Sequence, residues 1–300
     1  MEKKSRHADT HAGTGVSACV DSRRTVRAAT VAAFASMLTA MAVTGGMTES
    51  AELGEMRDAM RRLKRVDNLQ FTCTGTLQGD GAERGERVEV WSDQLSGSWV
   101  AEYYVTDEDG TRRYQKEFCD GRAVYVYIDW NGEWERREGG SVKTPCLETL
   151  TVLPYDNRDI AEAESVRKKG KQRISFQFTQ EFLGALSAEN MDAAERSFRT
   201  YEKSGVSEDA LHLAEMTLEQ YRRTQQERIT AVYTIDAENV LCEGMYKVES
   251  VQPQLNPDET GKVQLGGEQK LKLQVKTRVY RYNQAGILNK IEQCRSEVRY

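Results

Sequence analysis

One histidine lies beyond the N-terminal tail of this chain, and any histidine-dependent catalysis would have to use it. A Ser-His-Asp or Cys-His arrangement requires an imidazole that takes a proton from the nucleophile. His212 stands between Leu211 and Leu213 in a segment with helical spacing. A single histidine in such a place is more often structural than catalytic. The alternative, a hydrolase that uses His212, stays open on the sequence alone.

An acidic pair and a group of glycines could also belong to a catalytic or phosphate-binding site, but both lie where turns are expected. Asp107 and Asp109 lie in a predicted loop, where acidic residues commonly stabilise the turn itself. Gly79, Gly81 and Gly85 lie in a predicted hairpin and do not precede a helix, as a phosphate-binding loop would. We therefore predict no catalytic residue, no cofactor, no cofactor-binding residue and no metal ligand. The protein is not expected to be an enzyme, and no pattern identifies its ligand-binding residues.

The cysteines after residue 50 show no metal-binding pattern. They are widely and irregularly spaced, with no CxxC pair and no Cys-His cluster, so a zinc site is not expected. Export from the cytoplasm would permit disulfides, but an odd number leaves at least one thiol free. We expect small buried side chains in strands, and the spacing does not determine a pairing. The five residues are Cys73, Cys119, Cys146, Cys242 and Cys294.

Residues 28–48 form an uncharged segment of 21 residues behind three arginines. As a helix it would extend about 31 Å, enough to cross the hydrocarbon core of a membrane. It is either a cleaved signal peptide, with Ala-Met-Ala at 40–42 as the cleavage site, or a retained membrane anchor. Both alternatives predict an extracytoplasmic protein that is either secreted or anchored to the membrane. Export would use either the general secretory or the twin-arginine route. Residues 1–27 are expected to be a disordered basic region.

The composition limits the remaining possibilities. Residues 51–300 are long enough for one large domain, and we predict a single extracytoplasmic domain there. Hydrophobic residues make up 39% of the chain and charged residues 30%, so a core and a very polar surface are both expected. The formal net charge of −5 argues against nucleic acid as a partner.

The first part of this region predicts a helix followed by an antiparallel meander. Over residues 51–66, apolar residues recur every three or four positions, as in an amphipathic helix. Alternating runs follow between residues 69 and 128. Asp-Gly or Asn-Gly pairs separate or end them, and these pairs are strong hairpin signals between alternating segments.

The second part predicts helices followed by longer strands. Residues 135–170 appear irregular in pattern, and a helical stretch is expected over 180–226, broken at Ser187 and Gly205. Its two apolar stripes are expected to be core. These stripes are Met191, Ala194, Phe198 and Tyr201, then Leu211, Ala214, Leu218 and Tyr221. Strands are expected at 173–179, 228–236, 240–251, 270–282 and 287–298.

These elements predict an α+β fold whose sheet is covered mainly on one side. In the strand at 270–282, apolar and basic residues alternate, which indicates one buried face and one solvated face. A sheet of about 9–10 twisted strands curls. We therefore expect a strongly curved antiparallel sheet, an unclosed half-barrel, with the first and middle helices covering its concave face.

This order resembles the LolA-like lipoprotein-carrier superfamily, which includes envelope proteins of Gram-positive bacteria. A helix over 52–66 directly follows the export segment and runs into the first strand. The hairpin Phe-Cys-Asp-Gly-Arg-Ala-Val-Tyr-Val-Tyr at 118–127 is followed by Trp134. A helical insert then precedes a second set of long strands. No family residue is diagnostic, so no functional residue is carried over.

The resemblance implies a lipid, a lipidated partner or another apolar ligand held between sheet and helices. The leading hypothesis is a non-enzymatic extracytoplasmic binding or carrier protein for such a ligand. The alternative is a membrane-tethered interaction or sensor module whose sheet binds an envelope protein or polymer. An open apolar cleft would favour carriage, and a filled one a scaffold. A membrane contact is expected only through residues 28–48, and the sequence does not indicate an oligomeric state.

Overall fold

Eleven strands form one antiparallel, unclosed sheet in a computed structural model that describes residues 50–79, 82–107, 110–129, 132–137, 141–259 and 261–298. Five helices accompany the sheet in these ranges, so the α+β half-barrel prediction is confirmed, with more strands than expected. No helix in the described part of the chain is both long and apolar enough to cross a membrane. The predicted n-region and the segment at 28–48 lie outside the described residues.

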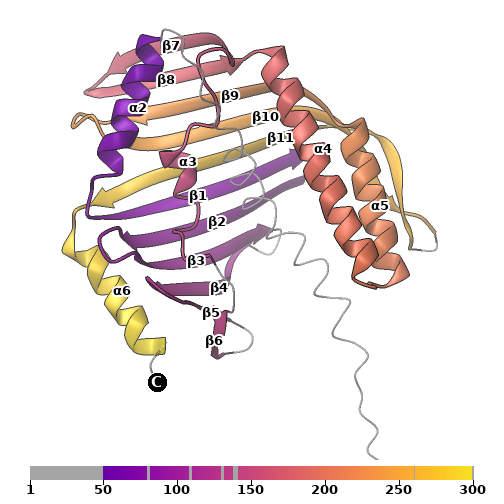
Figure 1. Ribbon diagram of the computed structural model, residues 1–300, viewed down its shortest axis with the longest axis horizontal. Coiled ribbons are helices and arrows are strands. Elements are labelled where there is room, and N and C mark those ends of the chain that lie inside the picture. The colour runs from indigo at the N-terminus through magenta and orange to yellow at the C-terminus, as the bar shows by residue number, and fades with distance from the viewer. Residues whose placement is uncertain are drawn as a thin grey trace, which may run out of the picture.

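The strands are ordered so that two chain neighbours, β6 and β7, occupy opposite edges of the sheet. Figure 1 shows the continuous twisted sheet from β7 at the top to β6 at the bottom. The order is β6-β5-β4-β3-β2-β1-β11-β10-β9-β8-β7. The first six strands are β1 (Asn68–Gly79), β2 (Ala82–Asp93), β3 (Ser98–Asp107), β4 (Gly110–Asp120), β5 (Val124–Ile128) and β6 (Trp134–Arg137). The others are β7 (Ile160–Lys168), β8 (Lys171–Phe178), β9 (Gln225–Ile235), β10 (Leu241–Pro257) and β11 (Val263–Tyr282).

The first helix forms where its apolar spacing predicts it. The Ser50 side chain caps α2 (Ala51–Leu63) by accepting a hydrogen bond from the Leu53 amide at 3.3 Å. Leu53, Met56, Met60 and Leu63 are all buried on one side of the helix. The other helices are α3 (Glu148–Thr151), α4 (Gln180–Lys203), α5 (Glu208–Arg223) and α6 (Ala285–Val298).

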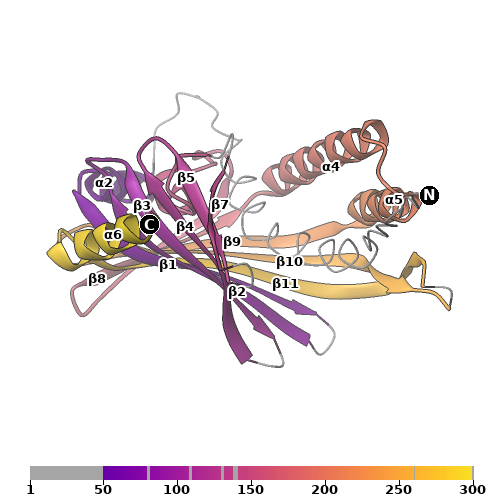
Figure 2. The same ribbon diagram turned by 90° about the horizontal axis from the view of Figure 1, so that it is seen from below.

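The two faces of the sheet carry separate cores because neighbouring strand residues point to opposite sides. We call the face that packs against α2 and α3 the inner face; Phe71, Trp99 and Phe176 belong to its core. The start of α4 packs against the same core, and α5 lies beside α4 over β10 and β11. Figure 2 shows α4 and α5 on the same side of these strands. The opposite, or outer, face has a small core of its own.

A connection from β6 to β7 has to cross the whole sheet, and residues 141–159, which we call the crossing segment, do so over the inner face. Its contacts follow the strand order. The Trp99 indole of β3 donates to the Val142 carbonyl at 2.9 Å, and Thr149 shares a hydrogen bond of 2.7 Å with Thr277 of β11. Further along, the Tyr155 hydroxyl donates to Tyr233 of β9 at 2.9 Å. The half-barrel is therefore closed over by its own chain.

Close approach of this segment depends on a glycine in β10. A β-carbon at Gly244 would lie 3.2 Å from the Leu150 side chain, tighter than ordinary van der Waals contact. Leu150 is fully buried above this position. Glycine here lets the crossing segment pack directly against the backbone of the sheet.

The prediction of a final strand at 287–298 is wrong, because these residues belong to α6. Ile287, Ile291 and Cys294 recur at helical spacing and pack against Val100 and Phe118 on the outer face. Val100 lies between Trp99 and Ala101, which belong to the inner core. Alternation therefore places α6 on the opposite side of the sheet from α2.

The region 135–170 is more regular than expected, since it contains β6, α3 and β7. Strand β7 pairs with β8 along one side only, and nearly all its side chains are exposed. Such an edge strand has no buried face, so its sequence shows no apolar alternation. The edge position explains why the pattern did not predict it.

The helical middle differs from the prediction in two ways. The predicted break at Ser187 is wrong because α4 continues through it, whereas the break at Gly205 is confirmed, with a φ of +65°. Of the two apolar stripes, only Leu218 is buried. The buried residues of α4 are instead Phe182, Leu183 and Leu186, in its first two turns.

We expect the crossing segment to contribute strongly to stability. Leu150→Ala should lower the free energy of unfolding by about 2–5 kcal/mol, because it leaves a cavity between the segment and β10. Leu95→Ala is the matched control: Leu95 is 79% exposed, so a change below about 0.5 kcal/mol is expected. Urea unfolding measures both. Equal effects of the two substitutions would contradict a packed crossing segment.

Candidate functional site

The inner face beneath α2 and α3 is filled by the protein itself. Its core is continuous from α2 through the crossing segment to β8, β9 and β10. Tyr155 contacts the rings of Phe176, Phe178 and Phe182, with centroids 4.7 to 6.4 Å apart. A space packed in this way functions as a core and leaves this part of the inner face without room for a ligand.

A chain of buried tyrosines at the centre of this core is structural. Tyr155 donates to Tyr233, and Tyr233 shares a hydrogen bond with Tyr246. Burial raises the pKa of each of the three well above the ordinary value, so the hydroxyls stay neutral. Each buried hydroxyl therefore has a partner and none is available as a base.

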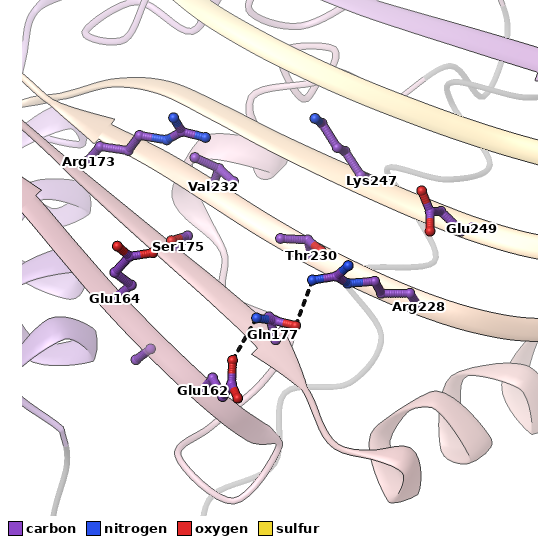
Figure 3. Close-up of a pocket in the computed structure, with 11 residues that line it drawn as sticks. Glu162, Glu164, Arg173, Ser175, Gln177, Arg228, Thr230, Val232, Lys247 and Glu249 are labelled. Atoms are coloured by element: carbon purple, nitrogen blue, oxygen red, sulfur yellow. Dashed lines mark hydrogen bonds between the residues drawn. The ribbon is translucent and has the colours of Figure 1, made fainter.

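The outer face of β7–β10 carries a hollow of about 710 Å³, which we call the outer hollow. Figure 3 shows the side chains of these four strands projecting toward it. The main contacts of α6 are elsewhere on the sheet, with β1, β2, β3 and β4. The lining residues are Glu162, Ala163, Glu164, Arg173, Ser175, Gln177, Arg228, Thr230, Val232, Lys247 and Glu249.

Strand alternation and register bring these residues together. In β8, Ile174, Phe176 and Phe178 face the inner core, so Arg173, Ser175 and Gln177 must face outward. Antiparallel pairing then places Glu162 opposite Gln177 and Glu164 opposite Ser175. The hollow is therefore a direct consequence of the buried face of the same strands.

A short hydrogen-bonded chain holds one end of the outer hollow. Gln177 donates to a Glu162 carboxylate oxygen at 2.7 Å and accepts from the Arg228 guanidinium at 2.8 Å (Figure 3). The amide thus links an acidic and a basic side chain across three strands, β7, β8 and β9. This end of the hollow is arranged before any ligand binds.

Two cations of the outer hollow are available to a ligand. Three acidic and three basic residues line it, so its charges nearly balance. Arg228 is engaged by Gln177, and Glu249 lies 3.6 Å from Lys272. Arg173 and Lys247 are exposed, and neither has a hydrogen bond or ion pair with another side chain in the described ranges. A ligand with acceptor groups would meet these two first.

The outer hollow has the chemistry of binding and lacks the groups of a hydrolytic site. Ser175 faces Glu164 across β7 and β8, but no imidazole lines the hollow to take a proton from the hydroxyl. Among the residues that the structure describes, no group of His, Cys, Asp and Glu could hold a metal ion. Its hydroxyl, amide and charged groups can form hydrogen bonds and ion pairs.

The residues singled out in the sequence lie elsewhere. His212 of α5 is half-buried, and its Nε2 lies 2.7 Å from the Val263 carbonyl oxygen, so Nε2 donates to that acceptor. A nitrogen that donates in this way does not serve as a general base. Asp107 and Asp109 have side chains outside the described set.

The cysteines are distributed differently from the prediction. Cys73, Cys119 and Cys242 do lie in strands, whereas Cys146 lies in the crossing segment and Cys294 in α6. All five are free thiols in this structure. The polar residues that alternate with apolar ones along β8 are the sequence signal for the outer hollow. The neighbouring strand β7 shows no apolar alternation, so the pattern did not predict that these residues face a hollow.

A second polar group lies on the inner face, toward the β6 edge. The buried Glu117 carboxylate accepts hydrogen bonds from Tyr103 at 2.7 Å, Gln115 at 2.8 Å and Arg137 at 3.2 Å. Glu86 shares the inner side of β2 with the buried Val88 and Val90. Burial raises the pKa of Glu86 to about 7.

Comparisons with known proteins give likeness in structure alone. No family model matches the chain, and no curated protein matches its sequence. The solved structures similar to it include the Mycobacterium tuberculosis lipoprotein LppX, at 11% identity and a TM-score of 0.36, covering 79% of this chain and 97% of that one. MucB in complex with MucA gives 11% identity and a TM-score of 0.26, covering 80% and 58%. A DUF1329 family protein from Desulfovibrio piger gives 10% identity and 0.28, covering 79% and 95%. At these TM-scores the likenesses carry no argument about function.

We expect Glu86 to make stability depend on pH near neutrality. Its folded-state pKa of about 7 lies above the ordinary 4.5, so the folded protein holds this proton more tightly than the unfolded chain. Stability should therefore fall as pH rises from 4.5 to 7 and change little from this group above that range. Glu86→Gln should remove this slope and raise Tm at pH 8.

Thermal unfolding between pH 4.5 and 8 measures the effect. Glu133→Gln is the control, because Glu133 is exposed beside β6 and the substitution should leave the wild-type profile in place. An unchanged slope in the Glu86 variant would show that other groups cause it.

Proposed function

We propose that this protein is a non-enzymatic, extracytoplasmic binding protein that holds its ligand in the outer hollow. One observation carries the proposal: in the described part of the chain the sheet is closed on the inner face by its own core, while the outer face of β7–β10 is hollowed. Because the inner face is filled, the structure favours an interaction module that binds an envelope protein or polymer on its surface over a carrier that encloses an apolar ligand. The likeness to LppX and MucB is compatible with this role and adds no weight to it.

The composition of the outer hollow favours a polar, extended ligand. Ala163 and Val232 are the two apolar residues among those that line it. An acyl chain gains about 0.8 kcal/mol for each methylene that it buries, and two small apolar residues offer little such burial. A segment of an envelope protein or a polar envelope polymer would instead use Arg173, Lys247 and the hydroxyls of Ser175 and Thr230.

The location of the protein rests on the sequence. We propose that residues 28–48 deliver the chain across the membrane and that 51–300 form one extracytoplasmic domain behind that segment. If the segment is retained, the outer hollow is displayed at a fixed distance from the membrane as a tethered module. If it is cleaved, the same hollow belongs to a released protein.

A second candidate function, carriage of an apolar ligand, is favoured by the α4–α5 hairpin. Met191, Phe198 and Leu211 were expected to be core but are only half-buried. Helices that keep apolar side chains partly exposed beside a sheet can contact a lipid or a lipidated partner. The ligand would then lie along this hairpin, away from the filled region under α2.

We expect the outer hollow to crosslink to its ligand in intact cells. A photoreactive benzoyl-phenylalanine at Glu164, on the exposed rim, should give a discrete adduct on irradiation. Combining it with Arg173→Ala and Lys247→Ala should lower the adduct yield about two- to thirtyfold, because exposed ionic contacts each contribute roughly 0.2–1 kcal/mol. Gel electrophoresis and mass spectrometry quantify the adduct.

The matched control places the same photoreactive residue at Lys203, at the end of α4, and removes the exposed cations Arg196 and Arg199 of that helix. Adducts of equal yield at both positions, or a yield insensitive to Arg173 and Lys247, would argue against the outer hollow as the binding site.

The carrier hypothesis has a separate test. Native mass spectrometry of the purified protein should detect a bound lipid if the hairpin carries one, and Phe198→Asp should abolish it by placing a charge on that surface. Leu95→Asp, in the exposed turn before β3, is the control and should retain the lipid. Lipid-free protein from a lipid-rich host would count against carriage.

A further inference from the structure

Two of the five cysteines lie close together on the inner face. Cys73 of β1 is paired with Thr277 of β11, and Thr277 shares a hydrogen bond of 2.7 Å with Thr149 of the crossing segment. The Thr149 hydroxyl also donates to the Cys146 carbonyl. Cys73 lies in the inner core and Cys146 is partly buried against it, although 72 residues separate them in the chain. A disulfide requires two cysteines of distant segments to be brought together in this way.

The surroundings hold Cys146 in this place without a covalent bond. Its backbone has a φ of +58°, a conformation that non-glycine residues rarely adopt. Thr149 donates to the Cys146 carbonyl at 2.7 Å and shares a second hydrogen bond with Thr277 of β11. Thr277 is also the direct neighbour of Cys73 across the β1–β11 pair. One short network therefore fixes both cysteines, and residues held in rare backbone regions often have functional roles.

The pair is also the one best suited to thiol–disulfide exchange. The interaction between its two side chains lowers the pKa of Cys73 and raises that of Cys146, so the first proton leaves the pair from Cys73. For the other thiols burial raises the pKa, to about 11 for Cys294. Cys119 and Cys242 contact backbone carbonyls, of Val142 and Thr234.

We propose that Cys73 and Cys146 form an intramolecular disulfide that pins the crossing segment to β1. The two thiols lose two protons and two electrons as the S–S bond forms, and a disulfide-type oxidant takes them up and becomes two thiols. Cys73 is fully buried in the folded protein and Cys146 partly buried, so exchange occurs while the chain folds, before the crossing segment docks. The other three cysteines remain thiols. This inference stands apart from the proposed function, since it concerns neither the outer hollow nor the α4–α5 hairpin.

The structural consequence is a covalent link across the opening of the half-barrel. Without it, hydrogen bonds and packing alone hold the crossing segment, and the segment can lift as a unit. With it, Cys146 stays next to β1, and the unfolded chain is restricted by a closed loop of 74 residues, from 73 to 146. The compartment's redox state thus sets how firmly the inner face is closed.

The test uses the full chain, refolded from urea in a mixture of oxidised and reduced glutathione. Free thiols are alkylated, and the digest is analysed by mass spectrometry without reduction. We expect a peptide pair joined through Cys73 and Cys146, lighter by two hydrogens, with Cys119, Cys242 and Cys294 alkylated. The oxidised protein should melt roughly 5–10 °C above the same protein in dithiothreitol.

Two variants make the result specific. Cys146→Ala should abolish both the linked peptide and the difference in Tm, whereas Cys242→Ala, the matched control in β10, should retain both. Wild-type protein before and after dithiothreitol provides the comparison should Cys146→Ala fold poorly. Alkylation of both Cys73 and Cys146 in the refolded oxidised protein, or a different linked pair, would overturn the proposal.

Discussion

The constraint on which the structure depends is that two successive strands, β6 and β7, lie at opposite edges of one sheet. The chain must therefore travel across the sheet, and residues 141–159 do so with a backbone that needs hydrogen-bond partners away from water. Trp99, Ser92 and Thr277 supply polar groups to that segment from β3, β2 and β11. The inner face of the sheet is thereby occupied by the chain that connects its edges.

The different roles of the two faces follow from this occupation. The crossing segment fills the inner face around Leu150 and Tyr155. The apolar strand residues on that side are therefore buried against other parts of the same chain. Within the described ranges α6 packs on the outer face against β1–β4, and outer side chains of β7–β10 line the hollow. Polar side chains are required there by solvation, and because they line a hollow they also form a surface that can recognise a polar ligand. The residues that keep this face soluble are therefore the same ones that we propose for binding.

Much of the fold could be predicted because local patterns carried it. The spacing of Leu53, Met56 and Met60 indicated α2, and alternation around Leu271 and Val275 indicated β11. The predictions were wrong where the local hydrophobic pattern does not show which residues the fold buries. Edge strand β7 has no buried face. In α6, Ile287, Ile291 and Cys294 recur at helical spacing, although the segment was predicted to be a strand. The half-exposed apolar stripes of α4 and α5 show that helical spacing predicts the helix and does not predict what covers it.

By itself, the sequence determined α2, the helical middle and most strands with their antiparallel hairpins, because these depend on residues near one another in the chain. Only the tertiary structure decided that the half-barrel is filled, that Arg173, Gln177 and Arg228 share one hollow, and that Cys73 meets Cys146. Those facts depend on the order of strands across the sheet. No local pattern encodes that order, because it is decided by which long-range pairings bury the most apolar surface while satisfying the backbone.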